Sequence, residues 1–173
     1  MILGSGGREH ALAWKISKSK LSDNLYIAPG NGGTSIVGIN VTLDINNFKE
    51  IKDYVLEKNI ELVIVGPEEP LVRGIVDFFK EDKDLKKVKI FGPGKSGAKL
   101  EGSKNFSKEF MFRNNIPCAK SETFNKNTLN NGFEFLENIS SPYVLKADGL
   151  AAGKGVLILD DLEEAKNELS NMI

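Results

Sequence analysis

The sequence has little of the chemistry that supports a disulfide or a zinc site. Its 173 residues include one cysteine, Cys118, and one histidine, His10. A single cysteine cannot form an internal disulfide, and together with one histidine it cannot supply the ligand set of a structural zinc site. These absences favour a protein of the reducing cytoplasm.

Long apolar runs and an excess of one charge are also missing. No apolar stretch approaches the ~18 residues that a membrane-spanning helix needs, and the N-terminus lacks the basic region and hydrophobic core of an export signal. The 23 Lys and Arg residues nearly balance the 24 Asp and Glu residues. A chain whose charges nearly cancel has no strong overall electrostatic field to attract a polyanion. We therefore expect neither nucleic acid nor membrane partners.

Short apolar segments alternate with helical patterns in the first part of the chain. We expect strands at Met1–Leu3, Leu25–Ala28 and Val37–Thr42 and in the runs ELVIV and VKIF, and helices at Glu9–Ser19, from about Asn46 and at Leu71–Lys80. Strands that alternate with helices are typical of parallel sheets. The sequence predicts an α/β fold in which an open, mostly parallel sheet is flanked by helices.

The pattern changes after Gly94. We expect a helix at Ser103–Asn114, a short strand after Pro117, a helix in NGFEFLENIS, and two strands joined by a glycine loop in PYVLKADGLAAGKGVLILD. This predicts an α/β substrate-binding domain over residues 1–100 and the beginning of an α+β domain over residues 101–173. The final run, DDLEEAKNELSNMI, begins like a capped helix and then stops, so we expect the chain to be part of a longer one.

The motif GSGGREH follows the first expected strand and opens a helix. A dinucleotide-binding loop needs glycine at its first, third and sixth positions, and Gly4 and Gly6 fit but the sixth residue is Glu9. This argues against a nicotinamide cofactor. Glycines at a helix start still present unpaired N–H groups to an anion, and Arg8 can add a bidentate charge. The motif predicts a phosphate site, with a ligand-free tight turn as the alternative.

The motif GPGKSGAK matches a Walker A loop only in part. A P-loop needs a glycine at the position that Lys89 occupies, and it joins a strand directly to a helix. Here we expect more loop to follow instead of a helix. Both points argue against a P-loop.

A lysine and a loop of small residues stand together in VLKADGLAAGKGVLI. Lys146 precedes the segment Gly149–Gly155, which carries a second lysine, Lys154. Small residues let backbone amides close over a triphosphate, and lysine supplies the point charge that phosphate oxygens need. The stretch predicts a nucleotide-binding loop, and a glycine-rich hairpin without a ligand is the alternative.

Five segments in order, GSGGREHALAWK, APGNGGT, VGPEEPLVRGIVD, FGP…LEGSK and YVLKADGLAAGKGV, resemble the N-terminal part of the glycinamide ribonucleotide synthetases, or phosphoribosylamine–glycine ligases, of the ATP-grasp superfamily. The resemblance covers the whole chain, which corresponds to less than half of the length of a full family member. It implies a ligase of de novo purine biosynthesis. Such an enzyme phosphorylates the carboxylate of glycine with ATP, and the amine of 5-phosphoribosylamine attacks the acyl phosphate to give glycinamide ribonucleotide, ADP and phosphate.

The resemblance also implies two sets of ligand-binding residues. The set that would hold phosphoribosylamine, at the carboxyl ends of strands, is Gly4, Ser5, Gly6, Gly7, Arg8, Glu9, Gly30, Asn31, Pro67 and Glu68. The set that would hold ATP is Lys104, Lys146, Asp148, Gly149, Leu150, Ala151, Ala152, Gly153, Lys154 and Gly155. The ligands of Mg²⁺ or Mn²⁺ would lie beyond residue 173, so we expect no metal site within the chain and no activity from it alone.

Some roles are open to more than one interpretation. Of the paired acids, we expect Glu68 to face the substrate and Glu69 to point away, because successive residues of an extended chain point to opposite sides. Two other functions fit parts of the pattern. Another ATP-grasp carboxylate–amine ligase, such as a biotin carboxylase-like enzyme, is disfavoured by GSGGREH with APGNGGT. A noncatalytic phosphosugar-binding fragment is the other alternative, and the early end of the chain favours it.

Overall fold

The computed structural model describes residues 1–150 and 155–173. The chain forms two compact units, Met1–Lys99 and Leu100–Ile173, and the division falls within helix α5 (Lys95–Gly102). Unit 1 contains the strands β1 (Ile2–Gly4), β2 (Tyr26–Pro29), β3 (Ile39–Asn40), β4 (Leu62–Val65) and β5 (Lys89–Phe91). Its helices are α1 (Gly7–Ile16), the 3-10 turn η1 (Thr34–Ile36), α2 (Phe48–Glu57), α3 (Glu68–Arg73) and α4 (Ile75–Glu81).

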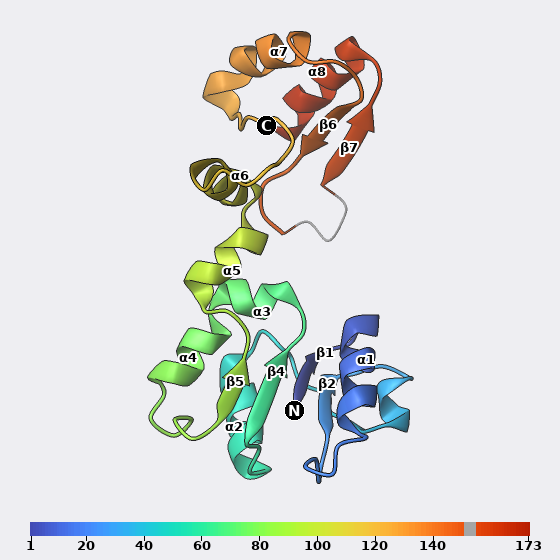
Figure 1. Ribbon diagram of the computed structural model, residues 1–173, viewed down its shortest axis with the longest axis vertical. Helices are drawn as coiled ribbons and strands as arrows, with labels where there is room; N and C mark the ends of the chain where they lie inside the picture. The colour runs from blue at the N-terminus through green and yellow to red at the C-terminus, as the bar shows by residue number, and fades with distance from the viewer. Residues whose placement is uncertain (151–154) are drawn as a thin grey trace. The chain divides into compact units, whose positions relative to one another are not determined.

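The strands of unit 1 form one parallel sheet with the order β3-β2-β1-β4-β5 (Figure 1). In its centre, Ile2 of β1 pairs with Ile27 of β2 on one side and with Ile64 of β4 on the other. The edge strands β3 and β5 are also parallel to their neighbours. The expected parallel α/β sheet is confirmed.

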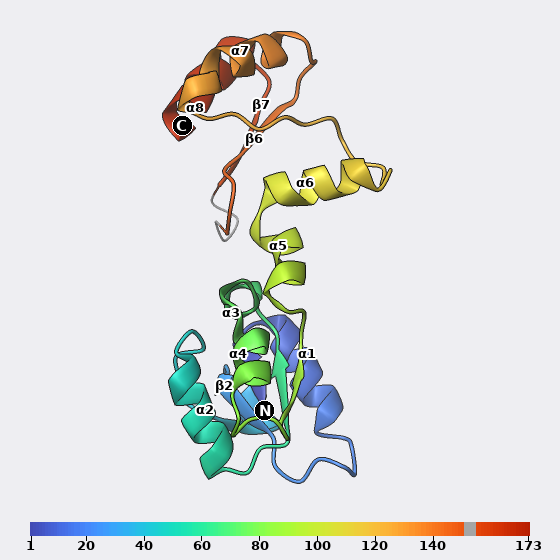
Figure 2. The same cartoon turned by 90° about the vertical axis from the view of Figure 1, so that its left-hand side faces the viewer.

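Different helices cover the two faces of this sheet. Ile2 and Ile27 pack with Ala13 of α1 on one face. The next residues along the strands point the other way, and Leu3 and Val63 pack with α2 and α4. Figure 2 shows α1 on one side of the sheet and α2 and α4 on the other. Burial of the central strands on both faces explains why β1 and β2 are apolar, whereas the edge strands β3 and β5 are more exposed.

The segment expected as one helix over Leu71–Lys80 is two helices, α3 and α4. Gly74 separates them because its φ of +96° lies in the left-handed region, where an α-helix cannot continue. Because α3 begins at Glu68, Glu68 and Glu69 are helical. We expected the two acids to point to opposite sides because they would lie in an extended chain, and this premise is wrong.

Two further expectations are corrected by the structure. Helix α5 begins at Lys95, close behind β5, so the expectation of more loop after GPGKSGAK is wrong. The other argument against a P-loop still stands, since Lys89 lies within β5. No strand follows Pro117, because residues 116–125 have no regular structure.

Unit 2 packs an antiparallel hairpin against helices. Beyond α5 its elements are α6 (Lys104–Arg113), the 3-10 turn η2 (Lys126–Thr128), α7 (Leu129–Glu137), β6 (Tyr143–Lys146), β7 (Val156–Leu159) and α8 (Leu162–Met172). Tyr143 and Leu145 face the helices and pack with Leu136, Ala165 and Leu169. On the opposite face of the hairpin, Val144, Val156 and Ile158 are exposed.

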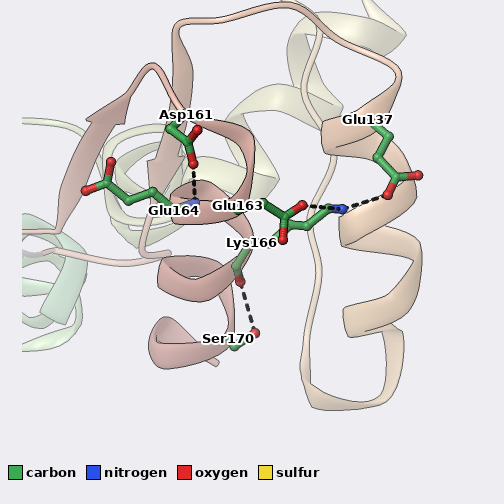
Figure 3. Close-up of polar contacts among 6 residues, drawn as sticks. All are labelled: Glu137, Asp161, Glu163, Glu164, Lys166 and Ser170. Atoms are coloured by element: carbon green, nitrogen blue, oxygen red, sulfur yellow. Dashed lines mark hydrogen bonds and ion pairs between the residues drawn. The ribbon is translucent and has the colours of Figure 1, made fainter.

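A polar contact joins α7 to α8. Lys166 Nζ lies 2.7 Å from Glu137 Oε1 on α7 and 3.2 Å from Glu163 Oε1 on its own helix (Figure 3). At the start of α8 the Asp161 carboxylate accepts the N–H of Glu164 at 2.8 Å. This N-cap is the helix start that the acidic run DDLEE predicts.

We predict that Gly74→Ala lowers the free energy of unfolding of unit 1. No neighbouring atom comes nearer than 3.4 Å to a Cβ at Gly74, so the cost comes from the left-handed backbone, about 1–2 kcal/mol. Denaturant unfolding followed by the fluorescence of Trp14, the single tryptophan and a residue of α1, measures it. The control is Gly32→Ala, where a Cβ meets open space. Equal stability of Gly74→Ala and wild type would contradict the prediction.

Candidate functional site

The residues predicted to bind phosphoribosylamine lie on three loops that follow neighbouring strands. The loops are residues 4–9 after β1 (the β1 loop), residues 30–34 after β2 (the β2 loop) and residues 66–68 after β4 (the β4 loop). Because β2, β1 and β4 are adjacent and parallel, their carboxyl ends lie at the same edge of the sheet, where open α/β folds bind ligands. The structure therefore brings this whole predicted set to one edge.

Hydrogen bonds connect the β1 loop to each of its neighbours. Asn31 Nδ2 of the β2 loop donates to the carbonyl of Ser5 at 2.8 Å. On the other side, Arg8 Nη1 donates to the carbonyl of Gly66 at 2.6 Å. The three loops are thus one hydrogen-bonded structure centred on the β1 loop.

Glu9 is a buried acid at the centre of this edge. Its side chain is 5% exposed, and its Oε2 accepts the N–H of Gly6 at 2.6 Å. A Cβ at Gly4 would come within 2.6 Å of Glu9 Cγ, and a Cβ at Gly66 would collide with the same side chain. Glu9 therefore fills the space that the third glycine of a dinucleotide-binding loop leaves open for close packing of strand and helix. Its side chain also leaves room only for glycine at positions 4 and 66. A direct contact between Glu9 and a substrate stays a prediction.

The start of α1 is open to an anion. Helix α1 begins at Gly7, and the first N–H groups of a helix have no carbonyl partner within it. Ser5, Gly6, Gly7 and Arg8 are all exposed at this end. The helix dipole places partial positive charge there. Arg8 commits one donor to Gly66, and a guanidinium has further donors for a ligand.

The other residues predicted to bind phosphoribosylamine differ in how far the protein itself already uses or buries their side chains. Asn31 uses its side-chain amide within the protein, because its Oδ1 also accepts the N–H groups of Gly33 and Thr34 at 2.8 and 3.0 Å. Pro67 is the N-cap of α3, and Glu68 behind it is half-buried while Glu69 is exposed. His10 lies over Gly33, where it leaves no room for a Cβ, so its role here is packing.

In unit 2, the start of α6 is hydrogen-bonded to the residues that follow β6. Asp148 Oδ1 accepts the N–H of Lys104 at 2.6 Å, and its Oδ2 accepts the hydroxyl of Ser103 at 3.1 Å. Lys104 Nζ in turn donates to the carbonyl of Gly149 at 2.8 Å. Three residues predicted to bind ATP, Lys104, Asp148 and Gly149, are therefore brought together.

The electrostatics of Asp148 follow from these contacts. Burial raises the pKa of its carboxyl, but the N–H groups of Asn105, Gly149 and Lys104 and the hydroxyl of Ser103 outweigh it, so the pKa is below its ordinary value. These donors favour the charged form, which also suits the N-terminal end of a helix. Ser103 and Asn105 were not predicted as site residues, because only the folded chain brings them to Asp148.

The remaining predicted ATP residues are placed as follows. Lys146 ends β6, is exposed, and lies opposite Val156 of β7. Leu150 is 43% exposed, and Gly155 accepts the N–H of Ala147 through its carbonyl at 2.8 Å. Ala151, Ala152, Gly153 and Lys154 lie outside the described residues.

Within residues 1–150 and 155–173, no group of three or more His, Cys, Asp or Glu side chains is arranged to hold a metal ion. Over the same residues, no helix is both long and apolar enough to span a membrane.

Comparison with known proteins agrees with this architecture. Residues 1–101 match the family described as phosphoribosylglycinamide synthetase, N domain, and residues 102–173 match phosphoribosylglycinamide synthetase, ATP-grasp (A) domain. A phosphoribosylamine–glycine ligase of Clostridium acetobutylicum is 46% identical over 169 residues, which are 98% of the chain and 39% of that relative. One of Haemophilus influenzae is 44% identical over 175 residues, 100% of the chain and 39% of that relative.

Solved structures show the same relationship. The crystal structure of phosphoribosylamine–glycine ligase from Thermotoga maritima matches with a TM-score of 0.71 and 36% identity, over 99% of this chain and 38% of that one. N5-carboxyaminoimidazole ribonucleotide synthetase from Thermus thermophilus, 17% identical, shares the fold with a TM-score of 0.70 over 99% of this chain and 43% of that one.

The fold is that of the N-terminal part of ATP-grasp proteins. Within that superfamily, the chain belongs to the phosphoribosylglycinamide synthetase family, because the two family matches together cover all of it. The chain spans 39% of the length of the curated relatives that it matches.

The hydrogen bonds of Asp148 predict a pH dependence. A carboxyl whose pKa is lower in the folded chain than its ordinary 3.8 stabilises the fold above that pH, and the contribution is lost as the pH falls toward the folded pKa. The amide of Lys104 reports this titration by NMR. We expect a midpoint below 3.8, and no such titration in Asp148→Asn. A midpoint at or above 3.8 would contradict the assignment.

Proposed function

We propose that this protein takes part in joining glycine to 5-phosphoribosylamine at the expense of ATP, with unit 1 binding the phosphosugar and unit 2 contributing to the ATP site. The observation that carries the proposal is the edge of unit 1, where the β1, β2 and β4 loops are hydrogen-bonded together around the open start of α1. The names of the relatives support the same reaction.

The chemistry of this edge suits a phosphorylated sugar. Unpaired N–H groups at the start of α1 match phosphate oxygens, and Arg8 adds a fixed positive charge beside them. Glu68, half-buried at the start of α3 on the adjacent loop, can accept hydrogen bonds from sugar hydroxyls. A dinucleotide fits poorly, because Glu9 occupies the space that a third glycine would leave open.

Unit 2 offers complementary groups to a nucleotide. On the face of the hairpin that turns away from the helices, Val144, Val156 and Ile158 are 46%, 39% and 69% exposed. Lys146 is on the same face of β6 as Val144, since alternate residues share a face. An apolar surface that ends in a lysine suits a purine ring followed by phosphates.

The proposed reaction has two steps. A carboxylate oxygen of glycine attacks the γ-phosphorus of ATP and ADP leaves, so the carboxylate becomes a glycyl phosphate. The amine nitrogen of phosphoribosylamine then attacks the carbonyl carbon, phosphate leaves, and the nitrogen loses a proton. Lysines such as Lys146 neutralise phosphate charge, and holding both substrates in place supplies much of the rate. No step of this proposal is routed through a metal ion.

The proposal is tested by assaying ADP formation in the complete polypeptide and in the 173-residue chain side by side. We expect the complete polypeptide to form ADP only when glycine and phosphoribosylamine are both present. We expect no such activity from these residues alone, because the chain spans 39% of the length of its relatives and the family resemblance places the metal ligands beyond residue 173. Glycine-dependent ADP release by the chain alone would contradict this part. A complete polypeptide that binds the phosphosugar without turnover would favour a noncatalytic binding protein.

A variant tests the ATP assignment separately. Replacing Lys146 with alanine in the complete polypeptide removes one charge-assisted contact to phosphate, so the KM for ATP rises by about tenfold or turnover is lost. Lys126→Ala, which removes an exposed lysine of η2 in the same unit, is the matched control. Unchanged ATP kinetics in Lys146→Ala would mean that this lysine does not contact ATP.

A further inference from the structure

The β2 loop contains a polar network that the proposed contacts with substrate do not use. Thr34 is 0% exposed, although it is polar and lies in a loop. Its Oγ1 accepts the N–H of Asn31 at 2.7 Å and lies 2.7 Å from Asn40 Oδ1. Asn40, the last residue of β3, donates from its Nδ2 to the carbonyl of Asn31 at 2.8 Å. Neither Thr34 nor Asn40 belongs to the predicted set.

The directions of these bonds follow from the donors available. A threonine hydroxyl carries one proton, and two acceptors, Asn31 O and Asn40 Oδ1, lie within 2.9 Å of it. The Asn31 carbonyl already receives the Nδ2–H of Asn40 and the backbone N–H of Ser35, which use both of its lone pairs, so the hydroxyl proton goes to Asn40 Oδ1. The three residues then form a closed ring in which both backbone polar groups of Asn31 are held.

This ring fixes the residue that connects two ligand loops. With its backbone held by Thr34 and Asn40, Asn31 extends its Nδ2 to the carbonyl of Ser5 in the β1 loop. The packing around the ring is tight, because a Cβ at Gly30 would come within 2.7 Å of Thr34 Oγ1. Gly30 also has a φ of +72°, which favours glycine. The loop therefore has little freedom to shift without breaking the ring.

We propose that Thr34 and Asn40 are positioning residues that act through Asn31 to hold the β1 loop in the geometry that binds the phosphosugar. The inference rests on the proposed function of unit 1. Neither residue need touch the substrate. Thr34 is buried, and the amide of Asn40 is directed at Asn31. Their effect reaches the β1 loop through Asn31 Nδ2, which donates to the carbonyls of Ser5 and Gly6 at 2.8 and 3.4 Å.

The first test uses isosteric variants of Thr34 in the 173-residue chain, with ribose 5-phosphate as the probe in calorimetric titrations. Thr34→Val keeps the shape but leaves Asn31 N–H and Asn40 Oδ1 without partners, so we expect about tenfold weaker binding. Thr34→Ser keeps the hydroxyl and restores binding. Ser35→Ala is the matched control, because it removes a hydroxyl from the same segment whose bond to the Gly32 carbonyl lies outside the ring.

The second test needs no ligand and examines the β1 loop directly. The amide of Gly6, bonded to Glu9 and not to Thr34, is followed by hydrogen exchange. We expect it to exchange faster in Thr34→Val and in Asn40→Asp, which loses the donor to Asn31, and at the wild-type rate in Thr34→Ser. Trp14 fluorescence and the midpoint of unfolding are measured first for each variant. The exchange rate of Gly6 is then compared only among variants whose values match wild type, so that global unfolding does not contribute to the difference.

The outcomes separate this inference from the proposed function. Ribose 5-phosphate affinity and Gly6 exchange that are both unchanged in Thr34→Val would overturn the positioning role. If wild type does not bind ribose 5-phosphate, the proposed function of unit 1 fails and the substrate role of the pair fails with it. Even then, the exchange of Gly6 decides whether Thr34 and Asn40 hold the β1 loop.

Discussion

The parallel pairing of β1 with both β2 and β4 is the constraint on which the site of unit 1 depends. It puts the carboxyl ends of three strands at one edge, so loops that are distant in sequence become neighbours. Asn31 then bonds the β2 loop to the β1 loop, and Arg8 bonds the β1 loop to the β4 loop. The buried carboxylate of Glu9 holds the middle through the N–H of Gly6. Without this strand order, the same residues would be separate turns.

Much of unit 1 could be predicted from the sequence because its sheet is buried on both faces. Continuous apolar runs such as 62–65 predict central strands, and glycines mark the loops after them. The break at Gly74 could not be predicted, because a local pattern does not reveal the sign of φ. Nor could the burial of Thr34, which depends on Asn40 reaching it from another strand. Sequence motifs locate loops well, whereas bonds between loops need the folded chain.

The site residues divide into groups that are free to bind and groups already engaged within the protein. Asp148 has both carboxylate oxygens bonded to the start of α6. Asn31 bonds the β1 loop through its Nδ2 and its own β2 loop through its Oδ1. Arg8 and Lys146 are exposed and keep donors for a ligand. The family resemblance names all four together. The hydrogen bonds separate the residues that we propose to contact ligand from those that hold the loops in place.

The central claim is that the edge formed by the β1, β2 and β4 loops binds a phosphosugar. The most direct measurement is an NMR titration of the 173-residue chain with ribose 5-phosphate, following every backbone amide. The account predicts saturable shifts concentrated in residues 4–9, 30–34 and 66–68, with none of comparable size when ribose replaces the phosphosugar. Shifts confined to other parts of the chain, or no shifts at all, would contradict it.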